Sequence, residues 1–140
     1  MSFDKEKVLQ LCNEWCNNTL MQTLEIEYID AGENFLTAKM PVNPRVHQPM
    51  GLLHGGASAA LIESIGSMGS VLLIDLEKEV PVGLEINANH ISGVSEGSVI
   101  ATGKIVHSGK RTHVWQVDIH HEETGKLVCT GRLTVMIIAK

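Results

Sequence analysis

The apolar stretch at residues 55–74, GGASAALIESIGSMGSVLLI, contains a single charged side chain, Glu63. An ionised carboxylate removed from water is costly unless it is paired, or it takes up a proton. Carboxyl groups with shifted pKa values cluster at functional sites. Glu63 is therefore the first candidate for a general base or a nucleophile. The structural alternatives are an ion pair with an arginine and a side chain that reaches a surface groove.

Polar and small residues precede this stretch: Gln48, His54, Gly55 and Gly56. Backbone N–H groups at the start of a helix suit a carbonyl oxygen that gains negative charge, and glycine leaves them accessible. Ser67, one helical turn beyond Glu63, could hold a carboxylate or a water molecule. The alternatives are a permissive glycine turn, a hydrogen-bonded structural His54, and a Ser67 that serves only close packing.

A basic cluster lies further along the chain, where three of the eleven Lys and Arg residues and one histidine fall within eight positions: Lys104, His107, Lys110 and Arg111. In an acidic chain this cluster is a candidate phosphate clamp, and the alternative is a solvated charged turn. His120 and His121 point to opposite faces of a predicted strand, so they do not ligate one metal together. No metal site is predicted.

These candidates need elements to position them. Helical spacing of apolar residues predicts a first helix at residues 4–17, capped by Asp4 and used for packing. Alternating apolar residues predict a hairpin at residues 24–28 and 36–42, followed by a loop that holds Pro41, Pro44 and Pro49. The stretch at residues 55–74 is small or apolar on every side, which predicts a helix buried on all faces. Four more strands are predicted at residues 80–91, 98–107, 112–121 and 126–138.

Short connections that contain glycine predict that consecutive strands are antiparallel neighbours. A sheet and one apolar helix both hide their apolar faces if the sheet curls around the helix, so we expect a single α+β domain over residues 1–140. One chain of 15.2 kDa cannot cover both sides of such a sheet. We therefore expect a homo-oligomer, a dimer or a tetramer, formed edge to edge or face to face.

Composition narrows the class of protein. The net charge of −5 argues against nucleic-acid binding, which needs a clustered positive surface. The first ten residues lack a signal-peptide pattern, and no run of 18 residues lacks polar groups, so we expect a cytoplasmic protein without a membrane segment. Three cysteines, Cys12, Cys16 and Cys129, are expected as buried reduced thiols.

Two blocks of the sequence resemble a known family: GLLHGGASAALIESIGS at residues 51–67 and VGLEINANH at residues 82–90. Together with the turn HSGKRT at residues 107–112, they resemble hotdog-fold acyl-CoA thioesterases of the phenylacetate-pathway and 4-hydroxybenzoyl-CoA type. Within that family they are most similar to bacterial 1,4-dihydroxy-2-naphthoyl-CoA hydrolases and enterobactin-pathway proofreading thioesterases. The resemblance extends over most of the chain and implies the hotdog fold.

The resemblance also implies roles. Glu63 would be the general base or nucleophile, the Gly55 N–H would bind the thioester carbonyl, Gln48 and His54 would orient the thioester, and Ser67 would assist. The site would lie between two subunits, and no cofactor would be needed. Residues implied to line the coenzyme A site are Gly83, His90, Ile91, Ser92, His107, Ser108, Gly109, Lys110, Arg111 and Thr112. Relatives commonly have an arginine after the NANH block, and this chain has none, so its phosphate contacts would depend more on Lys110 and Arg111.

The sequence therefore predicts an acyl-CoA thioester hydrolase that acts on aromatic acyl groups. General-base and anhydride routes stay open. Alternatives are a non-hydrolytic module that binds acyl-CoA or acyl carrier protein, and a proofreading hydrolase of acyl-carrier-protein thioesters. A hotdog dehydratase would need a histidine and an aspartate as acid and base, and the helix at residues 55–74 has no aspartate.

Overall fold

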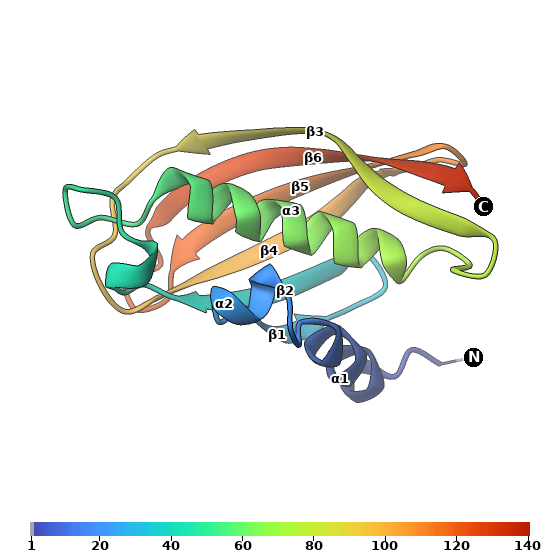
Figure 1. Ribbon diagram of the computed structural model, residues 1–140, viewed down its shortest axis with the longest axis horizontal. Helices are drawn as coiled ribbons and strands as arrows, with labels where there is room; N and C mark the ends of the chain where they lie inside the picture. The colour runs from blue at the N-terminus through green and yellow to red at the C-terminus, as the bar shows by residue number, and fades with distance from the viewer. Residues whose placement is uncertain (1) are drawn as a thin grey trace.

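A long helix, α3 (Gly55–Val71), lies in the concave face of a six-stranded antiparallel sheet in the computed structural model, which describes residues 2–140 (Figure 1). The strands follow the order β1-β2-β4-β5-β6-β3 across the sheet. Their bounds are β1 (Glu27–Ala31), β2 (Phe35–Pro41), β3 (Glu79–His90), β4 (Ser98–Ser108), β5 (Thr112–His121) and β6 (Leu127–Ala139). This is the predicted α+β arrangement of a curled sheet around one helix.

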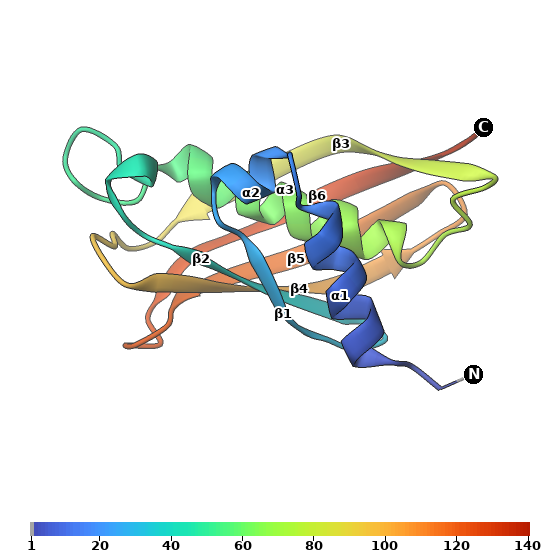
Figure 2. The same ribbon diagram turned by 60° about the horizontal axis from the view of Figure 1, so that its bottom comes forward.

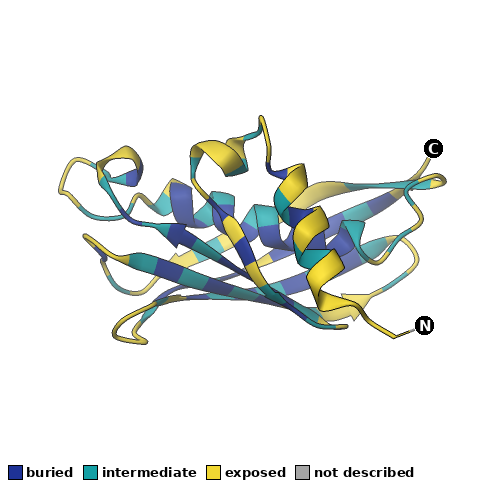
Figure 3. Cartoon of the chain, turned by 90° about the horizontal axis from the view of Figure 1, so that it is seen from below, coloured by how far each residue is buried: buried dark blue, intermediate teal, exposed yellow. Residues whose placement is uncertain are grey.

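Two helices precede β1 and lie on the side of the molecule where β1 and α3 face each other: α1 (Lys5–Trp15), which packs against β1, and the single turn α2 (Leu20–Thr23) (Figure 2). Asp4 caps α1 by accepting a hydrogen bond from the Lys7 N–H at 3.2 Å, as its side chain and position predict. Figure 3 shows the outer side of α1 exposed while the central strands are mostly buried. A single turn of 3-10 helix, η1 (Pro44–Val46), follows β2.

Small residues let α3 approach the sheet closely. A Cβ atom on Gly66 would overlap Leu133 of β6, and one on Gly69 would overlap the Trp115 ring of β5. The inner face of α3 adds the fully buried residues Leu61, Ile62 and Ile65 to the core. Close packing compensates for the low helix propensity of its glycines.

A buried polar cluster fixes the second half of α3 against β5. Ser70 and His113 are 0% and 3% exposed, and the Ser70 Oγ lies 2.9 Å from His113 Nδ1. The Trp115 Nε1–H donates to the same oxygen at 3.0 Å. Burial first, and the nearby His107 second, lower the pKa of His113, so its imidazole stays neutral. The position of α3 along the sheet is thus fixed by directional bonds as well as by packing.

Several boundaries differ from the sequence predictions. The strand predicted from residue 24 begins at Glu27, because residues 20–23 form α2 and Glu25 takes a positive φ of 57°. Pro41 ends β2 instead of lying in a loop, which is a position where a strand tolerates a missing N–H. The predicted helix at residues 55–74 ends at Val71.

The predicted pairing of consecutive strands is wrong for β3 and β4. The segment between them crosses the end of the curled sheet, so that β3 pairs with β6 at one edge while β4 pairs with β2 and β5. Because β3 closes the sheet from the far side of α3, a short connection does not make it a neighbour of β4.

The prediction that α3 is buried on all faces is also wrong for one chain. One face stays half-buried, at Ala60, Glu63, Ser64, Ser67 and Val71. Next to it, the edge strand β3 is mostly exposed, including the apolar side chains of Val82, Leu84 and Ile86 at 41%, 56% and 37%. A single chain therefore leaves an uncovered helix face beside an uncovered apolar sheet edge.

The cysteines Cys12, Cys16 and Cys129 are buried free thiols, and burial raises the pKa of Cys12 to about 11. Within residues 2–140, no helix is both long enough and apolar enough to cross a membrane.

Candidate active site

The Glu63 carboxylate lies on the half-open face of α3, directly against Gly83 of β3. A Cβ atom at Gly83 would lie 3.3 Å from Glu63 Cδ and would overlap Oε1. The absence of a side chain at Gly83 is therefore what leaves room for the carboxylate. Within residues 2–140 Glu63 forms no salt bridge, so the alternative of a structural arginine pair is not realised. Burial raises the pKa of the Glu63 carboxyl above its ordinary value.

An apolar pocket of about 310 Å³ opens beside this carboxylate. Ser67 lines it together with Glu63, as the one-turn spacing predicts. The remaining walls come from α1, α2 and α3: Trp15, Leu20, Met21, Ala60, Ser64, Met68 and Val71. Sequence reasoning assigned the first helix to packing and so missed Trp15, which is 44% exposed. The only feature of the sequence that could have indicated a role for Trp15 is its position at the end of the amphipathic pattern of the first helix.

A second pocket of about 310 Å³ lies at the start of α3 and contains Gln48, Gly55, His90, Ile91 and Ser92. Gly55 is the first residue of α3, so its N–H has no partner within the helix. Gln48 Oε1 accepts a hydrogen bond from the Met50 N–H, which leaves the Gln48 amide NH₂ as a donor. Ser58, which sequence reasoning did not name, also lines this pocket.

Two histidines frame the start of α3. His54 is the N-cap residue, and its Nδ1 accepts the Gly56 N–H at 2.7 Å, so the structural alternative for His54 is realised. The His90 ring lies over Gly55, where a Cβ atom would be 2.7 Å from His90 Nε2. Gly55 thus accommodates His90 on β3 in the same way that Gly83 accommodates Glu63 on α3.

Within one chain, the Glu63 group and the Gly55 group lie apart. Eight residues along α3 separate them, a rise of about 12 Å, and they line different pockets. A carbonyl bound at the Gly55 N–H is therefore out of reach of Glu63 in the same chain.

The residues implied to bind coenzyme A lie in two separate places, at opposite ends of β3. Lys110, Arg111 and Thr112 line a surface hollow of about 500 Å³ beside Glu79, at the start of β3. His107, Ser108 and Gly109 complete this turn, where the Gly109 N–H donates to Thr112 O at 2.9 Å. His90, Ile91 and Ser92 lie at the other end of β3, about 36 Å away along an extended strand. Among residues 2–140 there is no group of three or more side chains suited to hold a metal ion.

The sequence pattern of the Thioesterase superfamily matches residues 50–128. The chain belongs to the thioesterase superfamily. It is 43% identical to the Escherichia coli 1,4-dihydroxy-2-naphthoyl-CoA hydrolase over 138 residues, which cover 99% of this chain and 100% of that protein. It is 40% identical to the proofreading thioesterase EntH of Cronobacter turicensis over 138 residues, 99% of each chain.

Solved structures of thioesterases have the same fold. A mutant thioesterase from Pseudomonas aeruginosa superposes with a TM-score of 0.92 at 40% identity, covering 100% of this chain and 97% of that one. A thioesterase from Haemophilus influenzae gives a TM-score of 0.89 at 42% identity, covering 99% of this chain and 93% of that one. The predictions of a hotdog thioesterase fold and of a thioester hydrolase are confirmed.

The raised pKa of Glu63 predicts a stability effect in this thioesterase. The folded chain binds the Glu63 proton more tightly than the unfolded chain does. The contribution of Glu63 to the free energy of unfolding is therefore fully present below the ordinary glutamate pKa and is lost as pH rises through the raised pKa. Glu63→Gln removes this ionisation, so we expect a higher Tm than wild type at pH 7 and no difference near about pH 4. Calorimetry at both pH values measures this, with the exposed Glu123→Gln as control. A lower Tm for Glu63→Gln at pH 7 would contradict the desolvation argument.

Proposed function

We propose that this thioesterase hydrolyses aromatic acyl-CoA thioesters with Glu63 as its catalytic carboxylate. The observation that carries the proposal is an unpaired, half-buried carboxylate of raised pKa in the wall of an apolar pocket. Trp15 offers a flat apolar surface to an aromatic acyl group, and the flexible side chains of Met21 and Met68 adapt to its outline. A relative named for a naphthoyl-CoA substrate supports this choice of acyl group.

The proposed site is completed by a second copy of the chain. β3 is a twelve-residue edge strand with free backbone groups and exposed apolar side chains, which favours antiparallel pairing with its copy. Within one chain, the Glu63 carboxylate contacts the backbone of Gly83, and the His90 ring contacts the backbone of Gly55. A register that sets Gly83 opposite His90 of the partner subunit therefore brings Glu63 close to Gly55 of the partner subunit.

The same register brings the divided coenzyme A residues together. The turn at residues 107–112 lies beside the start of β3, and antiparallel pairing sets that end near the partner's His90. A dimer is the smallest assembly that completes the site, and the predicted homotetramer contains two such dimers.

The chemistry follows from these positions. The Gly55 N–H and the Gln48 amide donate to the thioester oxygen and stabilise the negative charge that develops on it. The partner's Glu63 then either removes a proton from an attacking water or attacks the acyl carbon to form an anhydride that water hydrolyses. In both routes the C–S bond breaks: in the first, the proton that Glu63 took from water passes to the leaving thiolate, and in the second, the thiolate takes its proton from solvent water. Both routes require the ionised carboxylate, and Ser67 is placed to orient it or the water.

We expect Glu63→Gln to lower kcat for benzoyl-CoA by about 10²- to 10⁴-fold with little change in KM, because the carboxylate acts in the transition state. In wild type, kcat/KM should fall as pH drops through the Glu63 pKa, at a pH above the ordinary glutamate value of 4.5. Thiol release measured across pH tests both statements. Wild-type protein that binds benzoyl-CoA without releasing thiol would favour the non-hydrolytic binding module.

Gly83→Ala tests whether catalysis depends on the contact between the Glu63 carboxylate and the backbone of Gly83. The added Cβ overlaps Oε1 and must displace the carboxylate, so kcat should fall by at least about tenfold, since small misplacements cost up to about 100-fold. The control is the same change in a Glu63→Gln background, where it should have little further effect on kcat. Equal losses in both backgrounds would show that Gly83 acts independently of Glu63.

Complementation between inactive variants tests the shared site. Glu63→Gln and Gln48→Ala, each inactive alone, are co-expressed in equal amounts. If each site takes Glu63 from one chain and Gln48 from the other, half of the dimers are mixed and each has one intact site. Activity then returns to about a quarter of wild type by this count of chains in a two-fold dimer. Activity that stays at the level of the single variants would place the site within one chain.

A further inference from the structure

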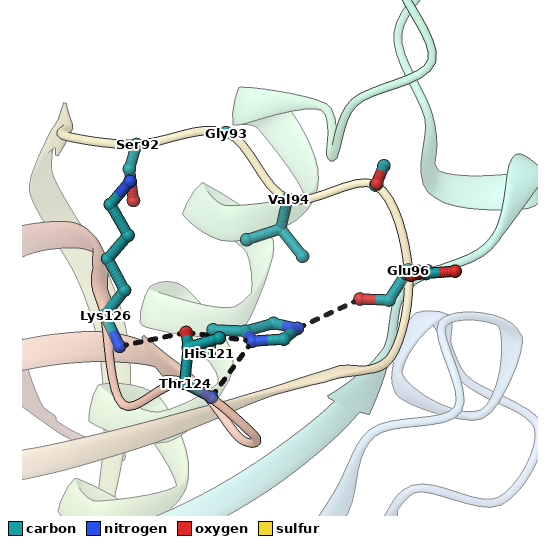
Figure 4. A pocket seen from close by; sticks show the side chains of 8 residues that line it. Ser92, Gly93, Val94, Glu96, His121, Thr124 and Lys126 are labelled. Carbon is teal, nitrogen blue, oxygen red and sulfur yellow. Dashed lines mark hydrogen bonds between the residues drawn. The ribbon is translucent and has the colours of Figure 1, made fainter.

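A hollow of about 220 Å³, lined mostly by residues with polar side chains, lies directly beyond the pocket that contains Gly55. The two hollows share Ser92 and Gly93 as a common wall. The 220 Å³ hollow is lined by the segment Ser92–Glu96, which leads from β3 to β4, by His121 at the end of β5, and by Thr124 and Lys126 from the turn between β5 and β6 (Figure 4). A ligand that fills the Gly55 pocket can therefore continue across Ser92 into this hollow.

The walls of this hollow are held together by hydrogen bonds. The Ser92 hydroxyl donates to Leu127 O at 2.6 Å, and the Ile91 N–H donates to Val128 O at 2.8 Å. These bonds fix the segment after β3 against the start of β6. The backbone N–H of Lys126 donates to Thr124 Oγ1 at 3.3 Å, which fixes the turn that carries Lys126.

His121 forms the floor of the hollow and has a structural role. Its Nε2–H donates to Glu96 O at 3.2 Å, and its Nδ1 accepts the Thr124 N–H at 3.3 Å. Both ring nitrogens are therefore occupied by bonds within the protein, and the ring holds the segment before β4 against the turn after β5. In Figure 4 the Glu96 carboxylate points away from the ring, on the side of the hollow opposite Ser92.

Lys126 supplies the positive charge of this hollow. Its side chain extends towards Ser92 (Figure 4). Within residues 2–140 its ammonium forms no salt bridge, whereas Lys5, Lys7, Lys39 and Lys78 all do. An ammonium without a carboxylate partner is suited to a phosphate group, and it is the donor of this hollow that remains available because the Ser92 hydroxyl donates its one hydrogen to Leu127 O.

We propose that Lys126 binds a phosphate of the group that carries the acyl thioester. This inference rests on the proposed function, because it requires the thioester carbonyl at Gly55. The pantetheine arm then leads from the Gly55 pocket past Ser92, and its phosphate-bearing end reaches Lys126. Coenzyme A and the phosphopantetheine of acyl carrier protein both have such a phosphate.

The test compares three thioesters of one acyl group: benzoyl-CoA, benzoyl-acyl carrier protein and benzoyl-N-acetylcysteamine, which ends before the phosphate. Lys126→Gln should raise KM for a phosphate-bearing substrate about five- to tenfold with kcat unchanged, because a remote phosphate is bound equally in the ground and transition states. KM for the N-acetylcysteamine thioester should not change. Lys126→Arg should retain most of the affinity, and Lys7→Gln on α1 controls for the loss of net charge.

The pattern of KM changes identifies the carrier. A rise for both phosphate-bearing substrates assigns Lys126 to the shared phosphopantetheine phosphate, and a rise for benzoyl-CoA alone assigns it to a nucleotide phosphate. A rise for benzoyl-acyl carrier protein alone assigns it to that carrier's phosphate. Unchanged KM for both, or an equal rise for the N-acetylcysteamine thioester, overturns the proposal.

Failure of the proposed function is a separate result. It appears as wild-type protein that releases no thiol from any of the three substrates. In that case calorimetric titration with coenzyme A decides the role of Lys126. Weaker binding to Lys126→Gln than to wild type supports the phosphate contact, and equal binding overturns it.

Discussion

The contact between the Glu63 carboxylate and the bare backbone of Gly83 determines how the rest of this site can be built. A carboxylate that is half removed from water is a stronger base than a solvated one, and it destabilises the fold while ionised. The chain tolerates this because α3 is fixed elsewhere, by the Leu61, Ile62 and Ile65 core and by the bonds to Ser70. The well-packed residues of α3 thus offset the free-energy cost of the ionised Glu63 carboxylate.

The spacing along α3 sets a second constraint. The N–H of Gly55 and the carboxylate of Glu63 are eight residues apart on one helix, so a single chain cannot bring both to one acyl carbon. The same chain leaves β3 exposed at the edge of its sheet, with the contacts of Gly83 and His90 seven residues apart along the strand. The proposed pairing of two β3 strands accounts for both features, because each copy would then supply the half of the site that the other lacks.

Sequence reasoning predicted the fold and singled out the candidate site residues because their signals are local. Glu63 was conspicuous as the only charge in an apolar helix, and Gly55 because a glycine pair opens that helix. Alternation located the strands, but it could not order them, since the position of β3 beside β6 depends on how the sheet closes around α3. The all-round apolar character of α3 was read as burial within one chain, whereas one face stays half open.

For a similar reason the sequence did not indicate that Trp15 lines a pocket, and it assigned Gly83 to the coenzyme A site without its contact to Glu63. Each depends on a neighbour distant in sequence: Trp15 lines the Glu63 pocket from another helix, and Gly83 matters through a carboxylate twenty residues earlier. The sequence did not indicate Lys126 either, because only the fold brings this residue close to Ser92.

The cluster of Ser70, His113 and Trp115 has an evolutionary consequence. One hydroxyl serves two rings of the neighbouring strand, and none of the three groups has access to bulk water to replace a lost bond. Substitution of Ser70 removes the partner of two buried ring nitrogens, and substitution of either ring removes one of the two bonds of the hydroxyl, so we expect the three positions to change together. Lineages of this enzyme should therefore keep the trio intact or exchange it whole.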